Sequence, residues 1–377
     1  MQIESFQAGN FTKGEGYSYF MPKPINHEWS WNDPKLSTLL EKASISLGEL
    51  NSFARLVPDI DLFIHSHVMK EAVVSSRIEG TKTNMDEAFL PKEEILPEKR
   101  SDWAEIQNYT LAMNTAIREL DHLPLSSRLL CKTHEILLSG VRGENKMPGQ
   151  YRQSQNWIGG ATLNDAVFIP PAHHHIGNLM SDLENILHNR DIDVPDLLRI
   201  AIAHYQFETI HPYLDGNGRI GRLMITLYLV DQKILNQPLL YLSSFFEKNK
   251  TLYYDNLTAV RNKNELNRWI KYFLIGIDET ARKSADTLSN ILKLKNTLEN
   301  NLHKNAGRRG ASALKLLTSL FKTPVINIKQ VEEICSLSTK AANDLVDLFV
   351  KENILKEISG KTRNRSFLFY QYIELYH

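Results

Sequence analysis

Twelve consecutive residues, from His211 to Arg222, combine side chains that are suited to phosphate chemistry. The run reads His-Pro-Tyr-Leu-Asp-Gly-Asn-Gly-Arg-Ile-Gly-Arg. An imidazole titrates near neutral pH, so His211 is a candidate general base. Asp215 offers a hard carboxylate oxygen of the kind that Mg²⁺ accepts together with phosphate oxygens. These residue types in this order predict a loop that binds a polyphosphate.

The surrounding sequence indicates where this loop lies. Apolar residues recur at helical spacing over 195–207 and again over 223–235. The run should therefore end at a helix N-terminus, where free N–H groups and the helix dipole attract phosphate oxygens. Gly216 and Gly218 let a ligand approach the backbone, because neither carries a Cβ. Arg219 and Arg222 lie three apart on one helix face and are expected to grip the same polyphosphate.

The run resembles the Fic-family signature, His-x-Phe-x-Asp/Glu-Gly-Asn-Gly-Arg-x-x-Arg, with Tyr213 at the usual Phe position. Fic proteins mostly transfer AMP to a protein hydroxyl, so the resemblance implies an adenylyltransferase with ATP as co-substrate and Mg²⁺ as cofactor. By the same resemblance, His211 deprotonates the target hydroxyl and Asp215 holds the metal. The nucleotide-binding residues that it implies are Gly216, Asn217, Gly218, Arg219, Ile220, Gly221 and Arg222. Doc-type relatives, which phosphorylate, carry lysine at the position of Gly218, so AMP transfer is favoured.

A second motif, Ser75-x-x-x-Glu79-Gly80, closes a helix that we expect over 59–78. The helix dipole disfavours a glutamate in the last turn, which indicates another use for Glu79. The alternative is that Gly80 is an ordinary helix cap and Glu79 a solvated acid. The motif resembles the inhibitory Ser/Thr-x-x-x-Glu-Gly/Asn motif of self-restrained Fic proteins. That resemblance implies that Glu79 pairs with Arg222 and blocks the productive pose of the γ-phosphate.

Other segments are similar to the family as well. Residues 147–160 resemble the stretch before the family's flap, which would be a β-hairpin over 161–168 with a strand at 167–169 and a turn at 164–165. Such a hairpin would dock a target segment by strand addition. Tyr253 and Tyr254 would border the base or ribose, unless they are core tyrosines. We expect no metal site at 173–175, because three adjacent histidines do not converge on one ion.

The composition is that of an ordinary globular protein, with 42% hydrophobic and 23% charged residues among 377. Lys+Arg and Asp+Glu both number 44, so the overall charge favours neither nucleic acid nor a membrane. Two distant cysteines, Cys131 and Cys335, give no disulfide framework and are typical of a reducing cytoplasm. The sequence contains no run near 18 apolar residues and no signal-peptide pattern, so we expect no membrane partner.

Helices are the elements that must position the loop. After an irregular arm over 1–34, we expect helices over 35–55, 102–120, 126–138, 176–188, 238–246 and 251–261, and one long helix over 266–302. The fold class is an all-α Fic fold with a small β-hairpin flap and a C-terminal winged helix-turn-helix. The expected domains are an N-terminal arm and inhibitory helical region (1–100), a catalytic core (101–280), a helical connector (281–303) and a winged-helix domain (304–377).

The C-terminal segment shows the element order of a winged helix-turn-helix: a helix over 313–321, an extended stretch over 325–328, helices over 329–335 and 338–351, and two strands within 354–369. Residues 303–377 hold 12 Lys/Arg and 7 Asp/Glu, and Lys361, Arg363 and Arg365 would sit at the wing tip. That excess favours DNA phosphates. Asp344 and Asp347 on the recognition helix favour protein docking instead, so both partners stay open. Relatives also suggest a homodimer.

Three alternatives to AMP transfer also stay open. A phosphotransferase would use the same cradle with the nucleotide reversed. A DNA-binding regulator would retain a vestigial core. The third alternative is the removal of AMP from a protein, with Glu79 orienting a water. Self-modification is common in the family, so the resemblance implies that this protein would also transfer AMP to itself.

Overall fold

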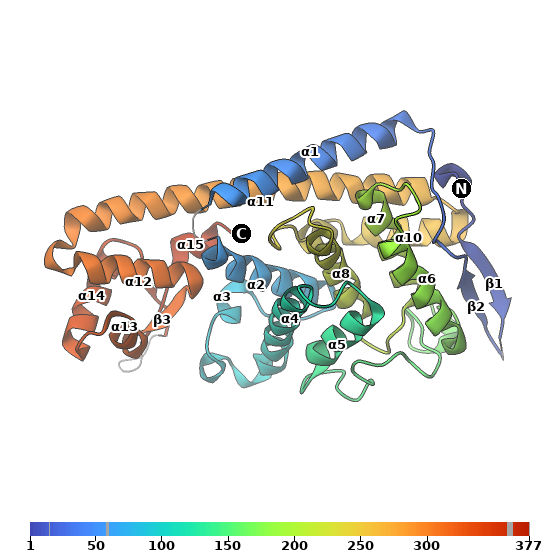
Figure 1. Cartoon of the computed structure of the whole chain (residues 1–377). Coiled ribbons are helices and arrows are strands. Elements are labelled where there is room, and N and C mark those ends of the chain that lie inside the picture. Colours follow the sequence, from blue (N-terminus) through green and yellow to red (C-terminus); the bar gives the residue numbers. More distant parts are fainter. Residues whose placement is uncertain (15, 58–59, 360–364, 377) are drawn as a thin grey trace.

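Two long helices run side by side in the same direction along one side of the molecule. The computed structural model describes residues 1–14, 16–57, 60–359 and 365–376. α1 (Pro34–Leu56) lies along the first half of α11 (Leu266–Asn305), as Figure 1 shows. Apolar side chains recur at helical spacing on the buried face of α1, at Leu36, Ala43, Leu47, Leu50 and Ala54. Asp33 caps the start of α1 and also pairs with Lys271 of α11, which fixes the register of the two helices.

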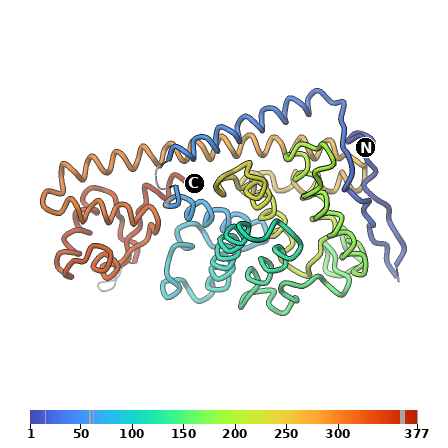
Figure 2. Tube along the Cα trace, in the orientation of Figure 1, coloured from blue at the N-terminus to red at the C-terminus, as the bar shows by residue number. Residues whose placement is uncertain are grey.

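A layer of shorter helices packs beneath this pair, as the chain trace in Figure 2 also shows. Its two central members, α7 and α8, are buried along nearly their whole length. The helices of the layer are α2 (Asp61–Ile78), α3 (Met85–Ala88), α4 (Arg100–Glu119), α5 (Ser127–Leu138), α6 (Ile176–His188), α7 (Asp196–Ile210), α8 (Asn217–Asp231), α9 (Ser243–Lys248) and α10 (Lys250–Lys263). The expected helix over 238–246 is wrong in its first half, because 238–242 is not helical.

The N-terminal arm is not irregular throughout, which corrects the expectation for 1–34. β1 (Gly9–Lys13) and β2 (Ser18–Pro22) form an antiparallel hairpin, in which Gly9 faces Pro22 and Lys13 faces Ser18. The inward side chains of β2 are buried, and Phe20 packs against Phe168. Glycine and proline residues and the shortness of the strands hid the two-residue period in the sequence. The N–H of Phe20 donates to the carbonyl of Ile169 at 2.9 Å, so this hairpin lies beside the expected flap.

The flap itself is not the β-hairpin that the sequence predicts. Residues 163–165 form a 3₁₀ turn, and Asp165 accepts hydrogen bonds from the N–H groups of Ala161 and Thr162. The expected strand over 167–169 is reduced to one antiparallel bridge between Ile158 and Phe168. The carboxylate turns the chain back before a ladder can extend, because it satisfies N–H groups that a strand partner would otherwise take. Val167, next to this bridge, is 77% exposed.

The C-terminal elements follow the order that the sequence predicts. They are α12 (Gly310–Lys322), β3 (Val325–Asn327), α13 (Ile328–Cys335), α14 (Thr339–Lys351), β4 (Lys356–Glu357) and β5 (Ser366–Leu368), followed by α15 (Tyr370–Glu374), which the sequence analysis missed. The strands pair antiparallel in the order β3-β5-β4. Lys361 and Arg363, assigned to the wing tip, lie outside the described residues.

This C-terminal unit packs against the rest of the molecule. α11 runs without a break from the central helices to α12, so the expected connector over 281–303 is part of one helix. α12 lies on α2, where Phe321 meets Phe63 with ring centroids 5.6 Å apart. In Figure 1 the unit occupies one end of the molecule and the β1-β2 hairpin the other. Over the described residues, every helix is too short or too polar to cross a lipid bilayer.

Candidate active site

The twelve-residue run forms the turn between α7 and α8. His211 ends α7 in a left-handed conformation, with φ of 51°, and Gly216 precedes α8 with φ of 75°. A left-handed residue is uncommon for a non-glycine side chain and indicates a constrained loop. α8 begins at Asn217, so the loop ends at a helix N-terminus, as the sequence predicts. The side chains that follow emerge from the first turns of that helix.

Asn217 holds the loop in shape by closing a ring with Tyr213. Its Oδ1 accepts from the N–H of Tyr213 at 2.8 Å, and its Nδ2 donates to the carbonyl of Tyr213 at 2.8 Å. Tyr213 is fully buried and stacks on His134, with ring centroids 3.9 Å apart and planes within 11°. His134 donates from Nε2 to the carbonyl of Asp215 at 3.0 Å. The side chain of Asn217 is therefore committed to the loop, and only its backbone is available to a ligand.

Arg152 and Asn156, in the stretch before the flap, support the same loop. Arg152 is 2% exposed, and its Nε donates to the carbonyl of His211 at 3.0 Å. Its other guanidinium nitrogens donate to the carbonyls of Ser154, Pro171 and Ile210. Asn156 donates to the carbonyl of Tyr213 at 2.9 Å. The sequence signal is weak, because an isolated arginine and asparagine give no pattern, and their partners in the loop, His211 and Tyr213, lie more than 50 residues away.

The imidazole of His211 is neutral at physiological pH. Burial and the nearby charge of Arg152 lower the pKa of His211 to about 4. Its Nδ1 is buried and has no hydrogen-bond partner among the described residues. A neutral ring with an uncommitted nitrogen can accept a proton, which is what a general base needs.

Asp215 lies beside this histidine on the loop. Its Oδ1 accepts from the N–H of Gly216 at 2.6 Å and lies 3.5 Å from a guanidinium nitrogen of Arg219. Its Oδ2 faces Gly143, where a Cβ would come within 2.9 Å of the oxygen. The side chain is 36% exposed, so one carboxylate oxygen can serve as a metal ligand. The described residues contain no group of three or more His, Cys, Asp or Glu arranged for a metal ion. The site therefore fits Mg²⁺ only in the way that the ion usually binds with nucleotides: Asp215 would supply one carboxylate ligand, and phosphate and water oxygens would supply the others.

The two arginines of the motif pair with different acids in this structure, and their shared grip on a polyphosphate stays a prediction. Nη1 of Arg219 lies 3.1 Å from Oε2 of Glu105 on α4, and both side chains are 1% exposed. Glu105 also pairs with the exposed Arg142 at 3.3 Å. A buried ion pair of this kind must be kept intact, because a single partner left alone would be a buried charge. Arg219 thus holds α8 against α4.

Arg222 instead faces the C-terminal end of α2. Its Nε donates to Oγ of Ser75 at 2.9 Å, and its Nη2 donates to the carbonyl of Ser75 at 2.9 Å and to Oε1 of Glu79 at 2.8 Å. Burial disfavours the charged form of Glu79, but the charge and hydrogen bond of Arg222 and the charge of Arg219 outweigh it and lower the pKa of Glu79. The expected pair of Glu79 and Arg222 is therefore present as a charged contact.

The carboxylate of Glu79 lies directly over the start of α8. A Cβ built at Gly218 would overlap Oε1 of Glu79 and come within 2.9 Å of Nη1 of Arg222. Glycine at 218 is thus what lets the glutamate reach the helix N-terminus. The same position is the one that a phosphate would take on the free N–H groups of the first turn.

The other residues predicted to bind the nucleotide differ in exposure, because some are buried in the core and one is at the surface. Ile220 is fully buried, and a Cβ at Gly221 would overlap Glu208 and lie 3.1 Å from the ring of Phe207. Tyr253 is 1% exposed, and its hydroxyl meets Nε2 of His204 at 2.9 Å. Tyr254 is 38% exposed on the same helix. Of the two tyrosines, Tyr254 is the one that a ligand can reach in this structure.

The sequence of this chain matches two models of one protein family, and it is similar to proteins named as adenylyltransferases. Residues 37–118 match the model of the Fic/DOC family N-terminal region, and residues 124–229 match the model of the Fic/DOC family. The chain is 29% identical over 178 residues to a probable protein adenylyltransferase of Aquifex aeolicus (strain VF5), covering 47% of this chain and 52% of that protein. It is 34% identical over 83 residues to the protein adenylyltransferase Fic of Drosophila erecta, covering 22% of this chain and 15% of the fly protein.

The fold also has a solved counterpart. A crystal structure of a Fic family protein from Desulfovibrio desulfuricans G20 superimposes with a TM-score of 0.57 at 18% identity, covering 90% of this chain and 96% of that one. At this identity the likeness concerns the fold. The chain spans about half the length of the Aquifex relative that it matches.

Proposed function

Because the chain belongs to the Fic/DOC family, we propose that it transfers AMP from ATP to a Ser, Thr or Tyr hydroxyl of a target protein and to itself. Pyrophosphate would be released. The observation that carries the proposal is the loop itself: a neutral His211 and a half-exposed Asp215 stand at the N-terminus of α8. General base, metal ligand and phosphate cradle are thereby within a few residues of one another.

In the proposed reaction, His211 accepts the proton of the target hydroxyl. The hydroxyl oxygen forms a bond to the α-phosphorus of ATP, and the bond from that phosphorus to the oxygen bridging the α- and β-phosphates breaks. The amides of the first turn of α8 orient the phosphates. Mg²⁺, held by Asp215, would neutralise charge on the phosphates. The buried Arg152 keeps His211 at the end of α7, where the base can meet the hydroxyl.

We also assign Glu79 the role of an inhibitor of this transfer. Its carboxylate pairs with the guanidinium of Arg222, one of the two arginines proposed to grip the polyphosphate of ATP. While that contact holds, the terminal phosphate lacks its counter-charge and meets a carboxylate instead. Such a juxtaposition of like charges costs binding free energy in a partly desolvated site. The contact must open before ATP can take the productive pose.

The flap over 161–168 is the proposed docking site of the target. Val167 is 77% exposed and Trp157 is 39% exposed, so the flap and the stretch before it present apolar surface. The single bridge between Ile158 and Phe168 leaves the rest of the flap backbone without strand pairing. An extended target segment can pair with such backbone.

The decisive experiment follows label from ATP into protein. Glu79→Gly protein with Mg²⁺ receives ATP labelled at either the α- or the γ-phosphate, with the chain itself and a cell lysate as acceptors, and Glu79→Gly/His211→Ala serves as the control. We expect α-label to enter protein, to depend on His211 and to be weaker in the wild type. Incorporation of γ-label instead would establish a phosphotransferase. Release of AMP from premodified protein by the wild type, and not by Glu79→Gly, would establish hydrolytic removal of AMP.

For the C-terminal residues 304–377 we propose a winged helix-turn-helix. The order of α12, β3, α13, α14, β4 and β5 supports it, with α13 and α14 as the helix-turn-helix. Asp344 and Asp347 are exposed on α14, which favours a protein partner over DNA phosphates. Titration of labelled duplex DNA with the full chain at several salt concentrations tests this, because phosphate contacts weaken steeply with salt. The cytoplasmic location and a homodimer stay predictions.

A further inference from the structure

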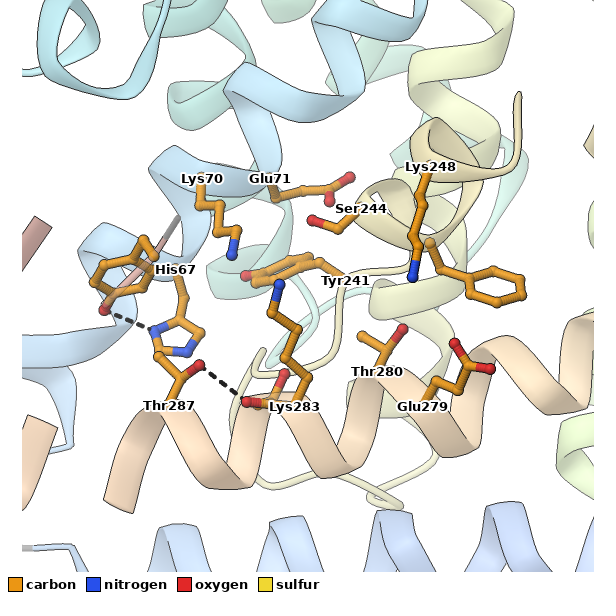
Figure 3. A pocket seen from close by; sticks show the side chains of 13 residues that line it. His67, Lys70, Glu71, Tyr241, Ser244, Lys248, Glu279, Thr280, Lys283 and Thr287 are labelled. Carbon is orange, nitrogen blue, oxygen red and sulfur yellow. Dashed lines mark hydrogen bonds between the residues drawn. The ribbon is translucent and has the colours of Figure 1, made fainter. Parts of the chain in front are cut away.

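A cavity of about 160 Å³ lies apart from the loop, between α2, α9, α11 and the segment that follows α15 (Figure 3). A single water molecule needs ~10–15 Å³ of such space, so the cavity is large enough for several waters or a small ligand. α2 and α11 form opposite walls, and Tyr376 covers one end beside His67. None of the residues assigned to ATP lines it. The cavity is therefore a separate feature of the fold.

Three lysines from three different helices surround this space: Lys70 of α2, Lys248 of α9 and Lys283 of α11. In Figure 3 the ammonium groups of Lys70 and Lys283 converge beside the ring of Tyr241. Among the described residues, none of the three lysines belongs to an ion pair. Elements far apart in the sequence thus bring positive charge together at one place.

The acids around the cavity offset this charge only in part. Glu279 is exposed at the mouth, and Glu71 lies on the inner wall. Burial raises the pKa of Glu71 to about 7, so near neutral pH this carboxyl is only partly ionised. With three lysines and two glutamates, the lining carries a net charge between +1 and +2. Burial and the charge of Lys283 lower the pKa of Lys70 to about 8, which an anion between the two ammonium groups would relieve.

The lining also supplies hydroxyl groups. Ser244 and Thr280 line the cavity from α9 and α11, and Tyr241 lies between the two converging lysines. The hydroxyl oxygen of Tyr241 is buried and has no hydrogen-bond partner among the described residues. A buried polar group without a partner is costly, and a bound ligand oxygen would satisfy it. Ammonium and hydroxyl donors together suit a group with several acceptor oxygens and more than one negative charge.

We propose that this cavity binds a small molecule that carries a phosphate group, with Lys70, Lys283 and Tyr241 around the phosphate and Lys248 at the entrance. Phosphate fits better than a lone carboxylate because it offers more acceptor oxygens and a larger charge to a lining with several donors. The size of the cavity suits inorganic phosphate or a short phosphate ester. The site stands whether or not the loop transfers AMP, since the two share no residue.

Isothermal titration calorimetry of the full chain tests the proposal, with inorganic phosphate and glucose 6-phosphate as probes and ionic strength held constant with chloride. The variant Lys70→Ala/Lys283→Ala removes the two converging charges. Lys293→Ala is the matched control, because it removes an exposed lysine from the same helix three turns further on. We expect wild type and control to bind alike, and the double variant at least about tenfold more weakly. Tighter binding of glucose 6-phosphate than of phosphate would identify an ester as the ligand class.

Hydrogen exchange locates the bound anion independently of any phosphate held by the loop. Ligand should slow amide exchange in 67–71 and 279–287 of the wild type and not of the double variant. If the double variant does not fold, Lys283→Ala alone serves, because this side chain is exposed on α11. Equal binding by all variants, or no binding by the wild type up to about 10 mM probe, overturns the proposal.

Discussion

Oε1 of Glu79 lies 2.8 Å from Nη2 of Arg222, although 143 residues separate the two along the chain. Ser75, one turn earlier on α2, accepts two more hydrogen bonds from the same guanidinium. The end of α2 and the second arginine of the loop therefore behave as one unit. A cation at the start of α8 is already paired before any nucleotide arrives, and its release requires movement of α2 or of the glutamate side chain.

Replacement of Glu79 by glycine should speed AMP transfer. The ion pair is partly exposed, with Glu79 at 32%, so its loss is expected to lower the free-energy barrier by about 1–2 kcal/mol, or roughly 5–30-fold in rate. Transfer of α-label from ATP at fixed protein concentration measures the change. Glu79→Gln should fall between the two, because it keeps the size of the side chain and removes the charge.

Glu247→Gln is the matched control for this comparison. It breaks the pair of Glu247 with Arg77, an exposed contact of 3.3 Å near the same end of α2, and leaves Glu79 in place. Its transfer rate should equal that of the wild type. Equal rates in wild type and Glu79→Gly would show that the contact of Glu79 with Arg222 does not restrain the enzyme.

The effect on stability of adding a side chain at Gly218 should depend on Glu79. A Cβ at 218 would overlap Oε1 of Glu79, so Gly218→Ala forces the glutamate away from Arg222. In Glu79→Gly protein the same Cβ meets no carboxylate. A double-mutant cycle by urea denaturation should therefore give a coupling of about 1 kcal/mol, with alanine costing more stability in the wild type than in the variant. Strict additivity would mean that the two residues do not meet at the helix start.

The sequence predicts the central part of the site because its signals are local. The helical period before and after the run places the loop at the start of α8, and α6 ends where the pattern ends. The inhibitory motif predicts the partner of Glu79, and the contact is present. Its regulatory role stays a prediction.

Residues that act across the fold escape such reasoning. Glu105 pairs with Arg219 over 114 residues, and Arg152 reaches carbonyls nearly 60 residues away. Neither leaves a periodic or spaced pattern in the sequence, because each contact depends on how helices meet. The prediction of a β-hairpin at the flap was wrong for a local reason. The side chain of Asp165 accepts hydrogen bonds from backbone N–H groups that the two-residue period assigns to a strand.

Arg152 should control the placement of His211 and not the binding of ATP. Its buried guanidinium donates to four carbonyls, including that of His211, and lysine cannot reproduce a planar fork of donors. In a Glu79→Gly background, Arg152→Lys is expected to lower kcat by about tenfold or more while KM for ATP changes little. Arg142→Lys, at an exposed partner of Glu105, is the control. A rise in KM at constant kcat would instead place Arg152 in nucleotide binding.

The ring of His211 should become protonated only in acid. Burial and Arg152 lower its pKa to about 4, below the ordinary value of 6.5. Between these two pH values the unfolded chain binds a proton that the folded site does not, so His211 contributes a loss of stability as the pH falls through this window. The folded ring should stay neutral down to about pH 5. Nuclear magnetic resonance titration, with His211→Gln to assign the signal, should show its midpoint near pH 4. A midpoint near 6.5 would mean that the ring is open to water and that the base is charged in mild acid.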